Sequence, residues 1–110
     1  MEKIVRIDMG AEGGPRTSET PVGEYAGLGG RAMTSAIVSR EVPPLCHPLG
    51  AENMLVISPG LLSGTTGVIS GRVSDGCKSP LTGGIKESNA GGQVGQILAK
   101  LWDAAVILEG

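Results

Sequence analysis

Residues 54–58, Met-Leu-Val-Ile-Ser, form a continuous apolar run that Pro59 and Gly60 end. A short apolar run bounded by turn residues is typical of a buried strand. Working outward from this run, residue patterns predict four further strands, at residues 3–9, 16–20, 72–78 and 104–108. The Gly-rich turn between the first two of these strands indicates an N-terminal hairpin.

Two segments have the spacing of helices, residues 30–41 and residues 93–101. Pro43 and Pro44 follow the first segment and end it, because the residue before a proline is pushed out of the α region. Each segment places apolar residues on one face, namely Ala32, Met33, Ala36 and Ile37 in the first and Val94, Ile97, Leu98 and Leu101 in the second.

The segments 60–71 and 79–92 are rich in glycine with Ser, Thr, Lys, Arg and Asn. Long loops in a compact domain are usually functional or disordered. In this composition, backbone N–H groups approach an anion closely while side chains bond its oxygens. The sequence therefore predicts one α+β domain over residues 1–110, with a β-sheet, two short helices and two long Gly-rich loops.

The core has to be built from small side chains. Trp102 and Tyr25 are the only aromatic residues in a chain of 110 residues with 19 glycines and no Phe. Aromatic side chains dominate core burial where they are present, and each glycine loses extra backbone entropy on folding. We therefore expect Trp102 to be buried, and the domain to depend on a partner segment, another subunit or a bound ligand.

Charge and hydropathy exclude several functional classes. The formal net charge is −2 and no basic block is present, which argues against nucleic-acid binding. The longest apolar runs have about five residues, too few to cross a membrane. The charged residues at positions 2–8 do not resemble a signal peptide, so we expect a cytoplasmic protein. Cys46, Cys77 and His47 do not have metal-ligand spacing.

Two motif matches fail on their context. Residues 27–32 fit the G-x-G-x-x-A form of the dinucleotide fingerprint, but the segment before them is not a buried parallel strand. Residues 71–79 resemble a phosphate loop, but Cys77 separates the second glycine from Lys78, and Pro80 replaces the required helix. The residues alone therefore predict a Gly-rich anion-binding module without chemistry of its own.

An ordered series of segments resembles the N-terminal domain of the aldehyde:ferredoxin oxidoreductase family. The segments that carry the likeness are Gly29-Gly30-Arg31, 41–44, 48–53, 59–65, Gly71-Arg72, 78–84, 88–92 and 106–110. Together they cover nearly the whole chain and leave residues 10–25 unmatched. The resemblance implies a β-sheet-rich N-terminal domain that cradles a pterin cofactor, here in an incomplete form.

The resemblance also implies chemistry. Members of the family bind tungsten, or molybdenum, between two pterin molecules, with Mg²⁺ bridging the pterin phosphates. They oxidise aldehydes to carboxylic acids and pass electrons through a [4Fe-4S] cluster to ferredoxin. Because the cluster cysteines belong to later domains, this chain alone is expected to be inactive. Its expected partners are the remaining domains on another chain, ferredoxin and a second copy of itself.

Six residues match the cofactor-binding positions that the resemblance implies: Arg72, Lys78, Asn89, Ala90, Gly91 and Gly92. The guanidinium of Arg72 suits a phosphate, and Lys78 adds positive charge. The backbone carbonyl of Asn89 is expected to bind the bridging Mg²⁺, which prefers oxygen ligands. Residues 90–92 begin the second helix, whose free N–H groups can bind an anion. No catalytic residue is expected in this chain.

Three alternatives remain open, one for these residues and two for the chain as a whole. Arg72, Lys78 and Asn89 can equally be a strand-end arginine, an exposed lysine and a turn asparagine. The chain itself can be a truncated fragment without function. It can also be a standalone module that binds a phosphorylated ligand without any partner.

Overall fold

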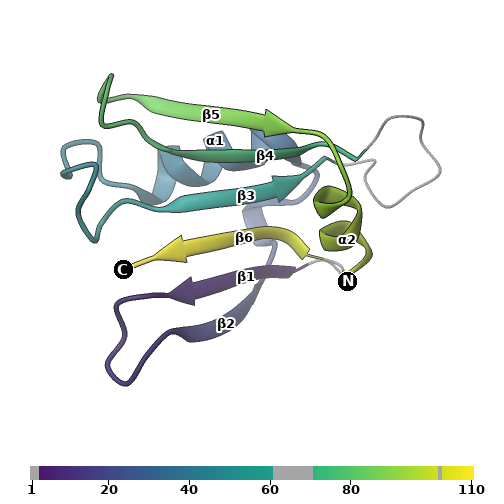
Figure 1. The fold of residues 1–110 in the computed structure, drawn as a ribbon, viewed down its shortest axis with the longest axis horizontal. Helices are drawn as coiled ribbons and strands as arrows, with labels where there is room; N and C mark the ends of the chain where they lie inside the picture. The colour runs from purple at the N-terminus through teal and green to yellow at the C-terminus, as the bar shows by residue number, and fades with distance from the viewer. Residues whose placement is uncertain (1–2, 61–70, 102) are drawn as a thin grey trace.

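The computed structural model describes residues 3–60, 71–101 and 103–110 (Figure 1). In this part of the chain, six strands and two α-helices follow one another, with a short 3-10 helix before the first α-helix. Their bounds are β1 Lys3–Asp8, β2 Arg16–Pro21, η1 Gly23–Tyr25, α1 Gly30–Glu41, β3 Leu55–Pro59, β4 Val73–Lys78, β5 Ile85–Ala90, α2 Val94–Lys100 and β6 Asp103–Glu109.

All six strands belong to one mixed sheet, in the order β2-β1-β6-β3-β4-β5. β1 and β6 run parallel, and every other neighbouring pair is antiparallel. The predicted N-terminal hairpin is β1–β2, with Ile4 opposite Thr20. The apolar run at residues 54–58 becomes β3, which lies between β6 and β4 and is an interior strand as its composition predicts.

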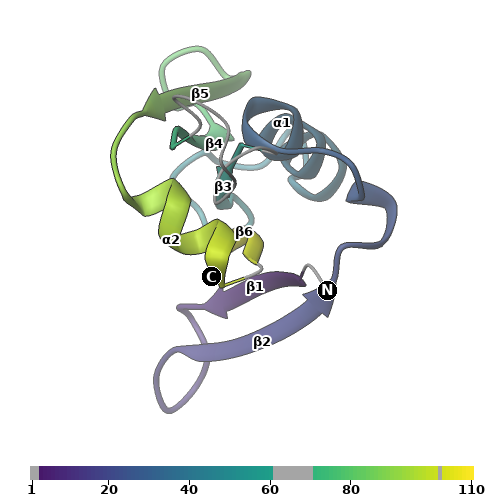
Figure 2. The same cartoon turned by 90° about the vertical axis from the view of Figure 1, so that its right-hand side faces the viewer.

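The two helices lie on opposite faces of the sheet, as the view in Figure 2 shows. α1 contacts β3, β4 and β5, whereas α2 contacts β3 and β6. α1 comes close to β4 because of Gly76, where an added Cβ would lie 2.8 Å from the Cβ of Thr34. A larger residue at position 76 would push the helix away from the sheet.

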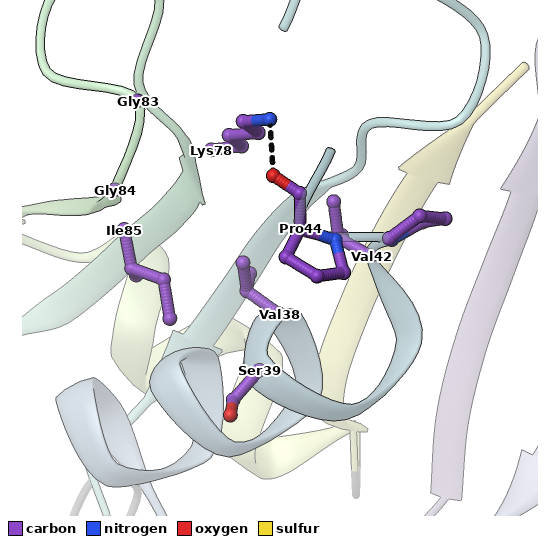
Figure 3. A pocket seen from close by; sticks show the side chains of 9 residues that line it. Val38, Ser39, Val42, Pro44, Lys78, Gly83, Gly84 and Ile85 are labelled. Atoms are coloured by element: carbon purple, nitrogen blue, oxygen red, sulfur yellow. Dashed lines mark hydrogen bonds between the residues drawn. The ribbon is translucent and has the colours of Figure 1, made fainter. Parts of the chain in front are cut away.

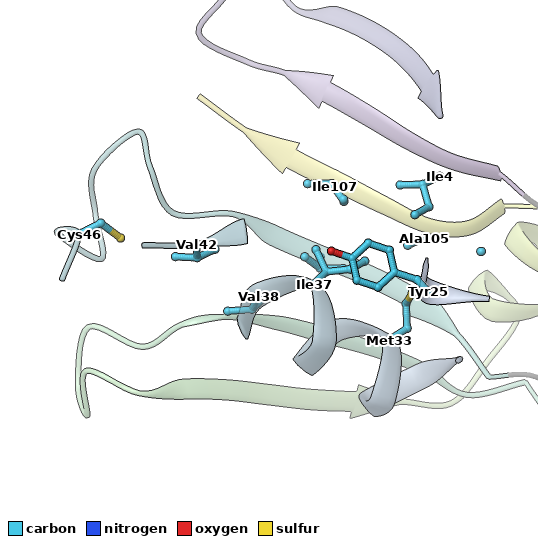
Figure 4. Packing of buried hydrophobic residues seen from close by; sticks show 11 residues of the cluster. Ile4, Tyr25, Met33, Ile37, Val38, Val42, Cys46, Ala105 and Ile107 are labelled. Atoms are coloured by element: carbon cyan, nitrogen blue, oxygen red, sulfur yellow. The ribbon is translucent and has the colours of Figure 1, made fainter. Parts of the chain in front are cut away.

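The core lies between α1 and the sheet (Figure 4). Met33 and Ile37 of α1 have no exposed surface, and they face strand residues such as Val56 and Ile107 that are equally buried. Tyr25 is the one aromatic ring in this cluster of described residues. The composition predicted a core of small aliphatic side chains, and this prediction is confirmed.

The predicted strands and helices are confirmed with shifts of a residue or two at their ends, but one prediction is wrong. Residues 79–92 were expected to form a single long loop, and the structure places β5 at residues 85–90 inside it. β5 is an edge strand that pairs only with β4, and five of its six residues are exposed. An edge strand buries little, so its polar sequence lacks the apolar pattern of a strand.

α2 shows a second difference from expectation. Its apolar spacing correctly predicts a helix, but the apolar row does not face the domain. Val94, Ile97 and Leu101 are 59%, 54% and 56% exposed. The buried residue of α2 is Gly95. Leu98 of the apolar row is half-buried, as are Gln96 and Ala99, so α2 meets the domain through Gly95 and these neighbours rather than through the whole apolar row.

Two predictions lie outside the described residues, the loop at residues 61–70 and the burial of Trp102. Among the described helices, none is long and apolar enough to cross a membrane.

Candidate anion-binding site

Five of the six predicted binding residues meet at one end of the β4–β5 hairpin. Arg72 directly precedes β4, and the strand register pairs Val73 with Ala90 and Ser74 with Asn89. Gly91 and Gly92 follow β5 at the same end. In Figure 1 this end of the sheet lies beside α2.

Close backbone contacts hold the two sides of this end together. A Cβ added at Gly71 would lie 2.7 Å from the carbonyl oxygen of Gly92. A Cβ added at Gly95 would lie 2.9 Å from the carbonyl oxygen of Gly71 and 3.0 Å from that of Arg72. The amide of Gly60 also donates to the Arg72 carbonyl at 3.3 Å. Only glycine allows backbones this close, so the glycines fix the position of the Arg72 backbone.

The backbone at Gly91 and Gly92 is open on its outer side. Among residues 3–60, 71–101 and 103–110, no heavy atom beyond the chain neighbours lies within 4 Å of where a Cβ would stand at either position. Gly92 also has φ +127°, a conformation that residues with a side chain rarely adopt. These two residues can therefore present N–H and C=O groups directly to a ligand.

Asn89 is held by its side chain. Ser74 donates a short hydrogen bond from Oγ to Asn89 Oδ1, and Asn89 Nδ2 donates to Glu87 Oε2 at 2.9 Å. Glu87 Oε2 also lies 3.3 Å from Nε of Arg31. Arg31 stands in the first turn of α1, where a cation opposes the helix dipole, and Glu87 is the anionic neighbour that compensates it.

The amino end of α1 lies at the same end of the sheet. A Cβ at Gly30 would be 3.5 Å from Ser74 Oγ and 4.0 Å from the Cα of Gly60. The first turn of α1 has no acidic residue, and Gly29 has no side chain to cap it. The amino end of this twelve-residue helix, with its partial positive charge, therefore lies at the end of the sheet where β4 begins.

Lys78 lies elsewhere. It ends β4 six residues after Arg72, about 20 Å away along an extended strand. Its side chain is buried, and Nζ donates to the carbonyl oxygens of Pro44 at 2.6 Å and Cys46 at 2.5 Å. The structure therefore does not bring Lys78 together with the other five residues. Instead Lys78 ties the loop after α1 to the sheet.

A pocket of about 200 Å³ lies beside Lys78, between the carboxyl end of α1 and the β4–β5 turn (Figure 3). Val38, Val42 and Ile85 provide most of its apolar wall. The pocket lies at the opposite end of the hairpin from Arg72. It is therefore not part of the predicted cofactor site.

A second polar cluster was missed by the sequence reasoning. Arg6 donates two hydrogen bonds to the carboxylate of Glu41, at 2.8 and 2.9 Å, and the hydroxyl of Tyr25 donates to the same carboxylate at 2.9 Å. The bonds from Arg6 lower the pKa of Glu41. Burial, followed by the bond to Glu41, raises the pKa of Tyr25 to about 12. The residues are 16 to 35 positions apart, and no motif joins them.

This second cluster is structural. It connects β1, η1 and the carboxyl end of α1, and its charged side chains pair with one another. Arg40 extends it, with its guanidinium 5.6 Å from the Tyr25 ring centroid and an ion pair to Glu24. Because the charged groups of this cluster pair with one another, the candidate anion-binding site is the Arg72 end of the sheet.

Across the described ranges, no group of three or more His, Cys, Asp or Glu side chains could hold a metal ion. Cys46 is buried after α1 and Cys77 lies within β4, both as free thiols. The described residues form an α+β module in which Arg72, the amino end of α1 and the turn at Gly91 and Gly92 lie at one end of the sheet.

The family follows from sequence comparison. The family model described as the N-terminal domain of aldehyde ferredoxin oxidoreductase matches residues 4–110. The chain therefore belongs to the aldehyde ferredoxin oxidoreductase family and corresponds to its N-terminal domain. The resemblance of the segments between Gly29 and Gly110 is thereby confirmed.

Individual relatives agree with the family model. The chain is 40% identical over 98 residues to a tungsten-containing aldehyde ferredoxin oxidoreductase of Thermococcus kodakarensis, covering 83% of this chain and 16% of the relative. It is 39% identical over 83 residues to the enzyme of the same description from Pyrococcus furiosus, covering 76% and 14%. The enzyme of this description from Pyrococcus horikoshii is 37% identical, with 98% and 18% covered. The chain thus spans less than a fifth of the length of these relatives.

A solved structure supports the fold. The active-site complex BamBC of benzoyl coenzyme A reductase, in complex with 1,5-dienoyl-CoA, superposes with a TM-score of 0.82 at 27% identity. The superposition covers 98% of this chain and 16% of that chain. The expected α+β arrangement is confirmed.

Proposed function

We propose that this chain is the tungstopterin-binding part of an aldehyde:ferredoxin oxidoreductase. The observation that carries the proposal is the gathering of Arg72 with residues 89–92 at one end of the β4–β5 hairpin. Arg72 and residues 89–92 lie apart in the sequence. They match cofactor-binding positions that the family resemblance implies. When bound, the metal centre supplies the oxidation of an aldehyde to a carboxylic acid, with electrons leaving through a [4Fe-4S] cluster to ferredoxin.

The residues present fit such a cofactor. Arg72 offers a guanidinium that can bind a phosphate in fork geometry. Within the part of the chain that the structure describes, no side chain lies close to the backbone of Gly91 and Gly92, so a flat or phosphorylated group can approach these glycines. Asn89 offers a carbonyl oxygen for Mg²⁺ between phosphates. Molybdenum in place of tungsten would suit the same residues.

In this proposal Lys78 is not a cofactor ligand. Its ammonium group uses two of its three N–H bonds on the carbonyls of Pro44 and Cys46. The proposed set is therefore Arg72, Asn89, Ala90, Gly91 and Gly92.

The chain supplies a binding surface, and the rest of the oxidoreductase supplies the chemistry. The two cysteines are too few for a four-cysteine cluster, and Cys46 is buried. The cluster would therefore be bound outside these 110 residues, which are inactive alone. Its proposed partners are the remaining oxidoreductase domains, ferredoxin and a second copy of itself, in the cytoplasm.

The test is metal analysis of the chain purified from its native host. We expect tungsten or molybdenum, together with magnesium, to copurify with the chain and with a polypeptide that carries the cluster. Arg72→Ala should lower cofactor retention roughly tenfold or more, because a hydrogen bond to a charged group contributes about 1.5–3 kcal/mol. Arg16→Ala is the matched control, since it removes an exposed arginine from β2 at the far edge of the sheet.

Three outcomes would contradict the proposal. Equal retention by Arg72→Ala and Arg16→Ala would remove the assigned site. Saturable binding of a pterin phosphate by the chain with no partner and no metal would favour the standalone module. Complete amide exchange in the purified chain, without any copurifying metal, would favour a truncated fragment.

A further inference from the structure

We infer that Ser74 and Glu87 are positioning residues for Asn89, whose side-chain amide they hold so that its backbone carbonyl stays fixed toward the bridging Mg²⁺. The inference rests on the proposed function, because Asn89 acts as a ligand only there. It adds two residues that match no cofactor position of the family resemblance.

Both polar atoms of the Asn89 amide already have partners. Oδ1 accepts from the hydroxyl of Ser74, and Nδ2 donates to Glu87 Oε2 at 2.9 Å. These two bonds fix the side chain against its neighbours and with it the strand position of the Asn89 backbone carbonyl, the atom that the proposed function assigns to Mg²⁺. A carbonyl oxygen has two lone pairs, so it can bind a cation even when one lone pair is used within the sheet.

The two clamping residues are themselves fixed. Ser74 is 4% exposed and lies under the amino end of α1, where a Cβ at Gly30 would be 3.5 Å from its hydroxyl. Glu87 is held by Arg31 of α1, with 3.3 Å between Oε2 and Nε. The Asn89 amide is thus connected to β4 through Ser74 and to α1 through Glu87.

The position of Asn89 explains why such a clamp is useful. Asn89 is exposed, near the end of an edge strand, and open glycines follow it. Ends of edge strands open easily, because few contacts hold them. Mg²⁺ requires near-octahedral oxygens at short distances, so side-chain support helps to fix a ligand on an exposed edge strand.

Ser74→Ala in the purified holoprotein tests the clamp, with Ser58→Ala as its matched control. Ser58 is also a buried strand serine, fully inaccessible, and it pairs with Ser74 across β3 and β4. Its hydroxyl donates to the carbonyl of Ala104 at 2.8 Å, whereas that of Ser74 donates to Asn89, so the control removes a buried hydroxyl at the same end of the sheet without touching the clamp. The readouts are magnesium and tungsten per chain during exposure to a chelator, and the midpoint of thermal unfolding. We expect both variants to lower the midpoint and only Ser74→Ala to lose magnesium roughly tenfold faster, as for other residues that support a metal ligand.

A second pair of variants covers the case in which Ser74→Ala fails to fold. Glu87→Gln keeps an oxygen that can accept from Asn89 Nδ2, whereas Glu87→Ala removes it. We expect magnesium retention close to that of the unsubstituted protein for Glu87→Gln, and faster loss for Glu87→Ala. Equal retention by the two Glu87 variants, or equal loss from Ser74→Ala and Ser58→Ala, would overturn the inference.

The result is distinguishable from failure of the proposed function. If Arg72→Ala loses the cofactor while Ser74→Ala and Glu87→Ala retain magnesium, the positioning role alone is wrong. If Arg72→Ala also retains everything, the site itself is wrong and the positioning role falls with it.

Discussion

The two helices lie on opposite faces of one sheet, but they are attached to it by different contacts. α1 buries Met33, Thr34, Ile37 and Val38 against the sheet. α2 approaches through Gly95, whose backbone lies against that of Gly71 and Arg72, and most of its apolar side chains point outward. α1 is held by a row of fully buried side chains, whereas the one buried residue of α2 is a glycine in close contact with neighbouring backbone.

This difference shows that apolar spacing along a helix does not decide which side meets the domain. Spacing predicts that a helix has an apolar face. Whether the domain covers that face depends on the elements beside the helix. A glycine on the opposite side of the helix lets that side approach a neighbouring backbone more closely than a side chain would allow. The exposed row of Val94, Ile97 and Leu101 is consequently available for contact with other polypeptide.

The largest expected difference between the helices is in their isoleucines. Ile37→Ala should reduce the free energy of unfolding by about 2–5 kcal/mol, because it leaves a cavity in the core. Ile97→Ala, the same change on α2, should stay within about 0.5 kcal/mol, because more than half of Ile97 is already exposed. Urea unfolding of both variants measures the two changes in the free energy of unfolding. Similar changes would show that Ile97 is packed as tightly as Ile37.

The glycine seat of α2 gives the next largest effect. Gly95→Val should reduce the free energy of unfolding by about 1–3 kcal/mol, because its Cβ would lie 3.0 Å or less from two backbone oxygens. Gly84→Val is the control, since its Cβ would meet only Thr82 Oγ1 at 3.8 Å. Thermal unfolding distinguishes the two, and a neutral Gly95→Val would mean that α2 is not seated on the hairpin.

The smallest effect concerns the anchoring of the carboxyl end of α1. Tyr25→Phe should cost about 1 kcal/mol at neutral pH, because it removes the hydrogen bond to Glu41. The unfolded tyrosine ionises around its ordinary pKa of 10.0, whereas the folded one keeps its proton to about 12. The advantage of Tyr25 over Phe should therefore shrink as pH rises from 10 to 12.

Tyr25 is the only tyrosine in the chain, so its absorbance titration can be followed without overlap from another. We expect the titration midpoint of Tyr25 near 12 in the folded protein. In Glu41→Gln, which removes the carboxylate, we expect a lower midpoint. A midpoint of 10 in the folded protein would contradict the role of the Glu41 cluster.

Much of the fold could be predicted from local pattern. The apolar run at 54–58 directly predicts β3, because apolar residues in a short run favour a buried strand. The double proline predicts the end of α1, because the residue before a proline is disfavoured in the α region. β5 could not be predicted, because its strand conformation comes from pairing with β4 rather than from its own composition. The outward face of α2 likewise depends on a contact made by Gly95.

The candidate site was predictable only in part. The family resemblance named Arg72 and residues 89–92, and the hairpin register places them at one end. The same resemblance placed Lys78 among them, but a strand of six residues moves Lys78 to the other end. The clamp of Ser74 and Glu87 on Asn89 has no sequence signal, because it depends on which strand faces which in the folded chain.

The pairing of β1 with β6 has a consequence for synthesis on the ribosome. β6 lies between β1 and β3, so the early hairpin β1–β2 can join the sheet only after residue 109 has emerged. At about 5–20 residues per second, the hairpin waits roughly 5–20 seconds with an unpaired edge. Until then the edge of β1 that will pair with β6 stays open to pairing with other strands.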